Sequence, residues 1–158
     1  MSVHPTPTAT HVGDNVRVFC QDRVAVVVPE SDAGFAETGR YAATRAAEIG
    51  APLAMLALIR PGVRGDPLRV RKGTHDLLTE HADCLSAVAM AIDGRGFFAS
   101  AFMSMASGVF LHVRHAPVPM QVFNQPEDAA TWLAKSIDVP PETVLAFVAT
   151  VRAQLEAA

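Results

Sequence analysis

The stretch that most constrains this chain runs from Leu85 to Leu111, and its only charged residues lie in a short break at its centre. The first part, Leu85 to Ile92, is a brief apolar run ended by Asp93 and Gly94. Such a run is typical of a strand buried on both faces of a mostly parallel sheet. After the break the apolar spacing changes to that of a helix. The stretch therefore predicts a buried strand, a tight turn and a helix.

The helix expected from Phe97 is apolar almost all the way round. The residues that share its core-facing side, at spacings of four, three and four, are Phe98, Phe102, Met105 and Val109. Burying each would contribute on the order of 1.5–3 kcal/mol. The opposite side holds serines and is flanked by Phe97, Met103, Phe110 and Leu111. A helix of this kind needs cover on more than one side.

Three interpretations of this helix stay open. It is a core helix sandwiched between the sheet and another element, or it is a homodimer face with Phe97, Met103, Phe110 and Leu111 as the interface. The third interpretation is a membrane span, since the uncharged run from Gly96 to Val113 just reaches the lower limit of about 17 residues. The serines within the run, and the strand that leads directly into it, argue against a span.

Composition favours one soluble globular domain. The chain has 158 residues, of which 50% are hydrophobic and 18% charged, with a formal net charge of -3. This balance excludes general disorder and a strong field for nucleic acid. Cys20 and Cys84 do not form a secreted disulfide framework, so we expect packed thiols.

Residues 1–14 contain prolines and threonines and no apolar block of signal-peptide length. We therefore expect a disordered lead-in to a cytoplasmic protein. The next residues predict a hairpin of two strands, 15–20 and 23–28, joined by a two-residue turn at Gln21 and Asp22.

The remainder alternates helices and strands. Glu30, Ser31 and Asp32 are suited to cap a helix that ends at Gly50, and Asp66 with Pro67 opens a second helix that reaches about Ala82. The two further strands expected are Leu53 to Ile59 and Met120 to Phe123.

Two helices end the chain. Asn124, with Glu127 three residues later, predicts a capped helix start, and residues 138–158 form a last helix packed on the domain. One position for that last helix is over the outer side of the apolar helix. The whole is an α/β fold with a single, mostly parallel five-stranded sheet, an N-terminal hairpin and four to five helices.

Two segments, AVAMAIDGRGFFASAFMSMASGVFL and MQVFNQPEDAATWLAKSI, resemble the STAS fold of anti-sigma factor antagonists. The closer resemblance is to bacterial STAS-like proteins, also described as SEC14-like, and it covers Asn15 to about Ile137. It implies a small cytoplasmic domain that docks onto other proteins. In some members a phosphorylated serine at the start of the helix after the third strand controls docking. Between Ile59 and Leu68 this chain has no serine or threonine, so that switch is not expected here.

A site for an anion is expected beyond the carboxyl ends of the parallel strands, where ligands of such sheets bind. The residues expected there are Arg60, Arg64 and Arg95 with Gly94 and Gly96. Guanidinium groups and the free N–H groups of helix starts both favour negative charge. The alternative is that these arginines are solvated and pair with nearby acids.

No pattern predicts catalysis. The sequence has no HExxH, CxxC, GxSxG or Walker motif, so we expect no catalytic residue, no metal and no cofactor. Arg69, Arg71 and Lys72 form a basic cluster on the second helix, which is either a solvated face or a docking face for a partner.

Two functions remain. The first is a non-enzymatic interaction or regulatory domain, with a homodimer as one form, that uses the faces of its second and third helices. The second is a small-ligand or lipid-binding domain in which the apolar helix lines a cavity and the edge arginines hold an anionic group.

Overall fold

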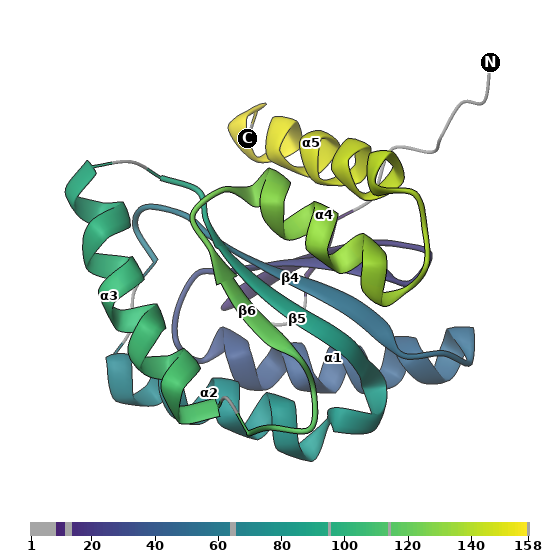
Figure 1. The fold of residues 1–158 in the computed structure, drawn as a ribbon, viewed down its shortest axis with the longest axis horizontal. Helices are drawn as coiled ribbons and strands as arrows, with labels where there is room; N and C mark the ends of the chain where they lie inside the picture. Colours follow the sequence, from purple (N-terminus) through teal and green to yellow (C-terminus); the bar gives the residue numbers. More distant parts are fainter. Residues whose placement is uncertain (1–8, 12–13, 64–65, 95, 114, 158) are drawn as a thin grey trace.

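The computed structural model describes residues 9–11, 14–63, 66–94, 96–113 and 115–157. These residues form an α/β fold of three layers (Figure 1). Helices α1, α2 and α3 lie on one face of a single sheet, and α4 and α5 lie on the other.

The sheet has six strands in the order in which they occur in the chain. They are β1 (Ala9–His11), β2 (Val16–Gln21), β3 (Val24–Pro29), β4 (Leu53–Ile59), β5 (Leu85–Ile92) and β6 (Met120–Phe123). The pairings from β3 to β6 are parallel, while β1 with β2 and β2 with β3 are antiparallel. The α/β class, the mostly parallel sheet and the five strands expected from the sequence are confirmed, and β1 adds a sixth.

The N-terminal region differs from expectation in two places. Ala9–His11, inside the segment expected to be disordered, pairs with β2 from Ala9 opposite Phe19. Residues 1–8 and 12–13 lie outside the described residues. The hairpin turn is Asp22 and Arg23, one residue later than predicted, because Gln21 pairs with Val24 and Asp22 takes the positive φ of 52°.

Five α-helices and one short 3₁₀ turn are described. They are α1 (Gly34–Ile49), α2 (Pro67–Glu80), η1 (Ala82–Cys84), α3 (Gly96–Val113), α4 (Pro126–Ser136) and α5 (Pro141–Ala157). The start of α2 is as predicted, because the Asp66 side chain accepts a hydrogen bond from the N–H of Leu68 and Pro67 is the first helical residue. The end of α1 is confirmed too, with Gly50 in the left-handed conformation at φ 68°.

Two predicted caps are wrong. Helix α1 follows Ala33 and has no side-chain cap, because Ser31 donates to Oδ1 of Asn15 and Asp32 accepts from the N–H of Asp66. The Ser31 hydroxyl and the Asp32 carboxylate therefore form tertiary hydrogen bonds instead of capping the helix. Helix α4 follows Gln125 rather than Asn124 and also lacks a side-chain cap.

The alternation along β5 assigns its two faces to two different cores. Val88, Met90 and Ile92 pack toward α1, α2 and α3. Ala87, Ala89 and Ala91 face the other way, where they meet the buried alanines and Leu133 of α4. Small residues on both surfaces let α4 lie close to the sheet.

Among the side chains that the structure describes, which do not include those of Phe98 and Val109, helix α3 is covered on one side only. Phe102 and Ala106 are buried, and Met103 and Met105 are half-buried against the core. Its exposed side consists of Ser100, Ala101, Ser104, Ser107 and Leu111. No other described element covers this side. Most of its side chains are serine or alanine, which leave little apolar area that needs cover.

The last helix does not lie over α3. Helix α5 packs on α4 and on β3, across the sheet from α3 (Figure 1). None of the described helices is both long and apolar enough to cross a membrane.

Candidate functional site

The loops after β4 and β5 meet at one edge of the sheet, as expected for parallel neighbours. The N–H of Asp93 donates to the carbonyl of Ile59 over 2.8 Å, which places the two loops side by side. Arg60 is half-buried directly after β4, Gly94 is half-buried after β5, and Gly96 begins α3 with a φ of 68°. Arg64 and Arg95, expected at the same site, lie outside the described residues.

A cavity of about 210 Å³ opens at this edge, beside the ends of β3 and β4. Its charged lining residues are Arg17, Glu30 and Arg60. The turn from Arg60 to Val63 forms one wall, closed by a hydrogen bond from the N–H of Val63 to the carbonyl of Arg60. Gly62 takes a φ of 93° there, the conformation that the third position of a type II turn requires.

Sequence reasoning missed Arg17 and its contact with Glu30. Nε of Arg17 lies 3.0 Å from Oε1 of Glu30, and the side chains are 23% and 50% exposed. The hairpin register brings them together, because Val16 pairs with Pro29 and the carbonyl of Asn15 accepts from the N–H of Glu30. A hairpin placed one residue later would have revealed this pair from the sequence.

Strands β5 and β6 mark the point where the connections change face. The chain leaves β5 toward α3 on one face and leaves β6 toward α4 on the other (Figure 1). In an open α/β sheet such a change creates a crevice suited to ligands. Here Arg152 of α5 binds Asp93 at the end of β5 with two hydrogen bonds, and Glu127 of α4 with a third.

These three bonds raise the pKa of Arg152, mainly through the hydrogen bond with Asp93. The Asp93 carboxylate is therefore held as the partner of a cation. This contact links α5 to the carboxyl edge of the sheet. We assign Asp93 a structural role rather than that of a free acid or base.

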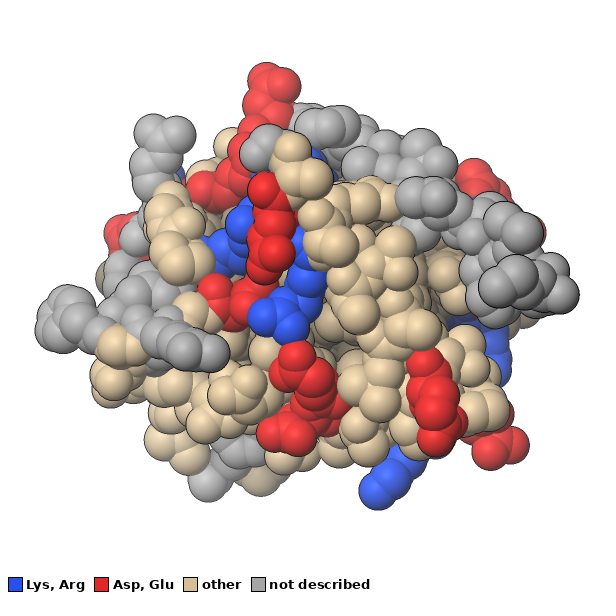
Figure 2. Space-filling model, turned by 90° about the horizontal axis from the view of Figure 1, so that it is seen from above, with Lys and Arg blue, Asp and Glu red and all other residues tan. Residues whose placement is uncertain are grey.

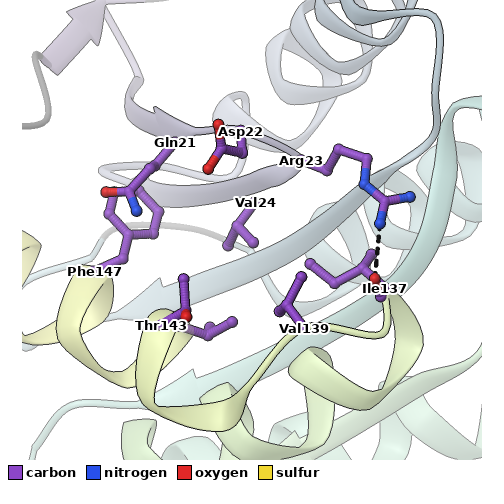
Figure 3. Close-up of a pocket in the computed structure, with 9 residues that line it drawn as sticks. Gln21, Asp22, Arg23, Val24, Ile137, Val139, Thr143 and Phe147 are labelled. Carbon is purple, nitrogen blue, oxygen red and sulfur yellow. Dashed lines mark hydrogen bonds between the residues drawn. The ribbon is translucent and has the colours of Figure 1, made fainter. Parts of the chain in front are cut away.

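A second cavity lies at the amino edge, between the hairpin turn and the connection from α4 to α5 (Figure 3). Its volume is about 50 Å³, which suits one or two waters at the share of about 30 Å³ that a water takes in the liquid. Nη2 of Arg23 donates to the carbonyl of Ile137 over 2.7 Å, shown as the dashed line. The lining is otherwise largely apolar, with Val24, Val139 and Phe147 among its residues. We assign this cavity no substrate.

The predicted interface on α3 is only partly exposed. Leu111 is 60% exposed, and Met103 is half-buried against the core. The side chains of Phe97 and Phe110 lie outside what the structure describes. Among the side chains that the structure describes, the other exposed large hydrophobic is Leu68, at 66%, near the start of the neighbouring helix α2.

The opposite face of the molecule is different in character. Over α4 and α5, basic and acidic side chains lie next to one another between uncharged areas (Figure 2). Arg152, paired with Asp93 and Glu127, comes from this layer. A surface of mixed sign is typical of a solvated exterior.

Titratable side chains also meet between β2 and α1. Burial raises the pKa of Tyr41 to about 12, and the charge of Cys20 adds to this shift. The charge of Cys20 is likewise the main cause that raises the pKa of Arg45. Arg45 also pairs with Glu48 at 3.4 Å.

Among the described residues, no group of three or more His, Cys, Asp or Glu side chains is placed to hold a metal ion. His81 lies against α1, because a Cβ atom at Gly39 would stand 2.6 Å from its imidazole Cδ2. This is the packing of a structural histidine.

Comparisons of this chain with protein-family models, with curated proteins and with solved structures found no significant match.

Proposed function

We propose that this chain is a non-enzymatic interaction domain of the STAS-like type, with a regulatory role, that docks an acidic protein partner through α2 and α3. The docking surface, which we call the α2–α3 face, comprises Leu68, Arg69, Arg71 and Leu111. The observation that carries the proposal is that the two exposed large hydrophobics of the described chain both lie on this face.

Both leucines lie near the point where α2 and α3 cross. A Cβ atom at Gly108 would stand 3.9 Å from Nη2 of Arg71, so the helices approach each other there. Leu68 precedes Arg71 by three residues, about one helical turn. Leu111 follows Gly108 by the same interval. Exposed leucines around one crossing supply the apolar centre that a protein interface needs.

The charges on this face favour an acidic partner. Arg69 and Arg71 are exposed, and neither guanidinium has a hydrogen bond or ion pair with another described residue. The nearby acids are engaged, since Asp66 caps α2 and Asp76 binds Lys72 at 2.7 Å. The hydrogen bond from Lys72 holds the pKa of Asp76 below its usual value. A local positive surface on a chain of net charge -3 attracts negative partners.

A second copy of this chain is the competing occupant. Helix α3 contains no Asp, Glu, Lys or Arg, so two copies could meet along it without burying charge. A two-fold contact around the crossing would, however, bring Arg69 and Arg71 of both copies together. Like charges brought together weaken an interface, which is why we favour an acidic partner.

The resemblance of residues 15–137 to STAS-like domains supports docking as the mode of action. The absence of serine and threonine between Ile59 and Leu68 argues against the phosphorylation switch of that family. The regulation we propose is therefore by occupancy of the α2–α3 face.

The test uses two fluorescent amphipathic helical peptides with the same leucine face, one with flanking glutamates and one with flanking lysines. We expect the acidic peptide alone to bind, and Leu111→Glu and Arg71→Glu each to weaken it by about tenfold or more. Lys135→Glu makes the same charge change as Arg71→Glu at an exposed site of α4 and should leave binding unchanged.

Equal binding of the two peptides, or equal weakening by all three variants, would overturn the proposal. Light scattering of the same proteins adds a second reading. A dimer of two 16.8 kDa chains that Leu111→Glu dissociates would assign the face to a second copy instead.

A further inference from the structure

We propose that the cavity bounded by Arg17, Glu30 and Arg60 is a binding site for a small oxyanion, a phosphate or a carboxylate. The lining comes from β2, β3 and the turn after β4, with no residue from α2 or α3. The site is thus separate from the α2–α3 face and independent of the docking function.

The first argument is an unused donor. Nε of Arg17 is buried, and it makes no hydrogen bond although Oε1 of Glu30 is only 3.0 Å away. The two groups attract each other as charges, but the N–H does not point at the carboxylate oxygen. Buried donors in folded proteins normally have an acceptor. An oxyanion in the cavity would supply one.

The second argument is charge. The described lining of the cavity holds two arginines and one glutamate, which leaves one excess positive charge. No ion pair joins the Arg60 side chain to any other residue that the structure describes. Bonds from guanidinium to carboxylate or phosphate are among the stronger hydrogen bonds in proteins.

The third argument is rigidity. Arg60 begins a turn closed by the bond from Val63, and the Arg17 strand is paired residue by residue with β3. The backbone of Glu30 is bonded to Asn15, so only its half-exposed side chain is free to move. An incoming anion can therefore displace the Glu30 carboxylate while the backbone that carries both arginines stays in place.

Size restricts the ligand. Pockets for drug-sized molecules span about 300–1,000 Å³, whereas this cavity is about 210 Å³. Phosphate and short carboxylates fit that space, and a lipid tail does not. The site shares Arg60 with the anion site expected from the sequence and adds Arg17, while Arg64 and Arg95 lie outside the described residues.

The test is titration calorimetry of the full chain with inorganic phosphate and, separately, with succinate, each against chloride at constant ionic strength. We expect binding of at least one oxyanion. Arg60→Gln and Arg17→Gln should each weaken it by about tenfold or more. Arg40→Gln removes the same charge from an exposed site of α1 outside the cavity and should not change the affinity.

Glu30→Gln is the decisive variant, because it removes the competing carboxylate and keeps the side-chain volume. We expect it to bind the oxyanion about tenfold more tightly. Affinity that stays unchanged in Glu30→Gln, or falls equally in Arg60→Gln and Arg40→Gln, would overturn the site. Circular dichroism of each variant would establish that the fold is intact. Loss of peptide docking would not affect this result, so the two proposals fail separately.

Discussion

Arg152 donates hydrogen bonds to both carboxylate oxygens of Asp93, with Nη2 2.8 Å from Oδ1 and Nε 3.2 Å from Oδ2. The pair joins the last helix to the end of β5, and the side chains are 30% and 20% exposed. The same guanidinium reaches Glu127 at the start of α4 through Nη1 at 2.7 Å. One side chain thus joins α5, α4 and the carboxyl end of β5.

Arg152→Met should destabilise the protein by on the order of 1–3 kcal/mol, because it leaves Asp93 partly buried without its partner. Urea unfolding followed by circular dichroism measures this. Glu127→Gln is the control, since the ion pair of the 55% exposed Glu127 side chain with Arg152 should contribute less than about 0.5 kcal/mol. Additive effects of Asp93→Asn and Arg152→Met in a double-mutant cycle would contradict the coupling.

Ala89→Leu should destabilise the protein by on the order of 1–3 kcal/mol, because Ala89 is fully buried between β5 and the alanine side of α4. The added volume pushes α4 off the sheet. Trp132, the only tryptophan, packs against Phe123 in a tilted arrangement with the ring centroids 5.7 Å apart, so its fluorescence should report the movement. Ala36→Leu, at an exposed position of α1, should leave both stability and fluorescence nearly unchanged.

Two glycines within helices should respond to alanine in opposite directions. At Gly73 a Cβ atom would stand 2.8 Å from Cβ of Phe35, so Gly73→Ala must separate α1 from α2 and should cost on the order of 1–3 kcal/mol. At Gly108 the nearest atom is 3.9 Å away, so alanine should stabilise α3 by about 0.5–1 kcal/mol. Thermal unfolding of the two variants tests this, and shifts of the same sign would refute it.

Tyr41 should titrate near pH 12 rather than near 10, because burial opposes its ionisation. It is the only tyrosine, so the phenolate absorbance of the intact protein reports it directly. Cys20→Ala should move the midpoint back toward 10, since the charge of Cys20 contributes to the shift.

The same shift links Tyr41 to stability. A pKa raised on folding means that the folded state keeps a proton that the unfolded state loses. The contribution of neutral Tyr41 is therefore complete below about pH 10 and disappears as the pH rises toward 12. Tyr41→Phe should lose less stability than the wild type across that interval in urea titrations.

The sequence predicted the central strands well because a strand buried on both faces is apolar at every position. Leu53–Ile59, Leu85–Ile92 and Met120–Phe123 have the bounds expected from that pattern. Local chemistry was equally sufficient for the start of α2, where Asp66 and Pro67 act on their own helix.

Expectations failed where side chains serve distant parts of the chain. Ser31 and Asp32 read as caps, yet they bind Asn15 and Asp66, which no local pattern reveals. The position of α5 was also missed. The alanines of β5 could have indicated it, because small side chains on one face of the sheet let an alanine-rich helix and the helix packed on it lie close to that face.

The candidate site was predicted only in part for a related reason. Arg60 follows directly from the end of an apolar strand, so its place at the carboxyl edge could be inferred. Arg17 reaches the same cavity from an antiparallel strand that runs the other way, and only the hairpin register shows this.

The strict chain order of the strands has a consequence for how the protein assembles. Each strand pairs with the one before it, so a chain emerging from the ribosome always meets a partner that has already been made. Contacts between neighbours in sequence form quickly, because the loops they close are short. Helix α4 also packs on β4, which is distant in the sequence, and helix α5 returns furthest, to β3 across more than a hundred residues. We expect its docking, secured by Arg152, to be the late step that commits the molecule to its native state.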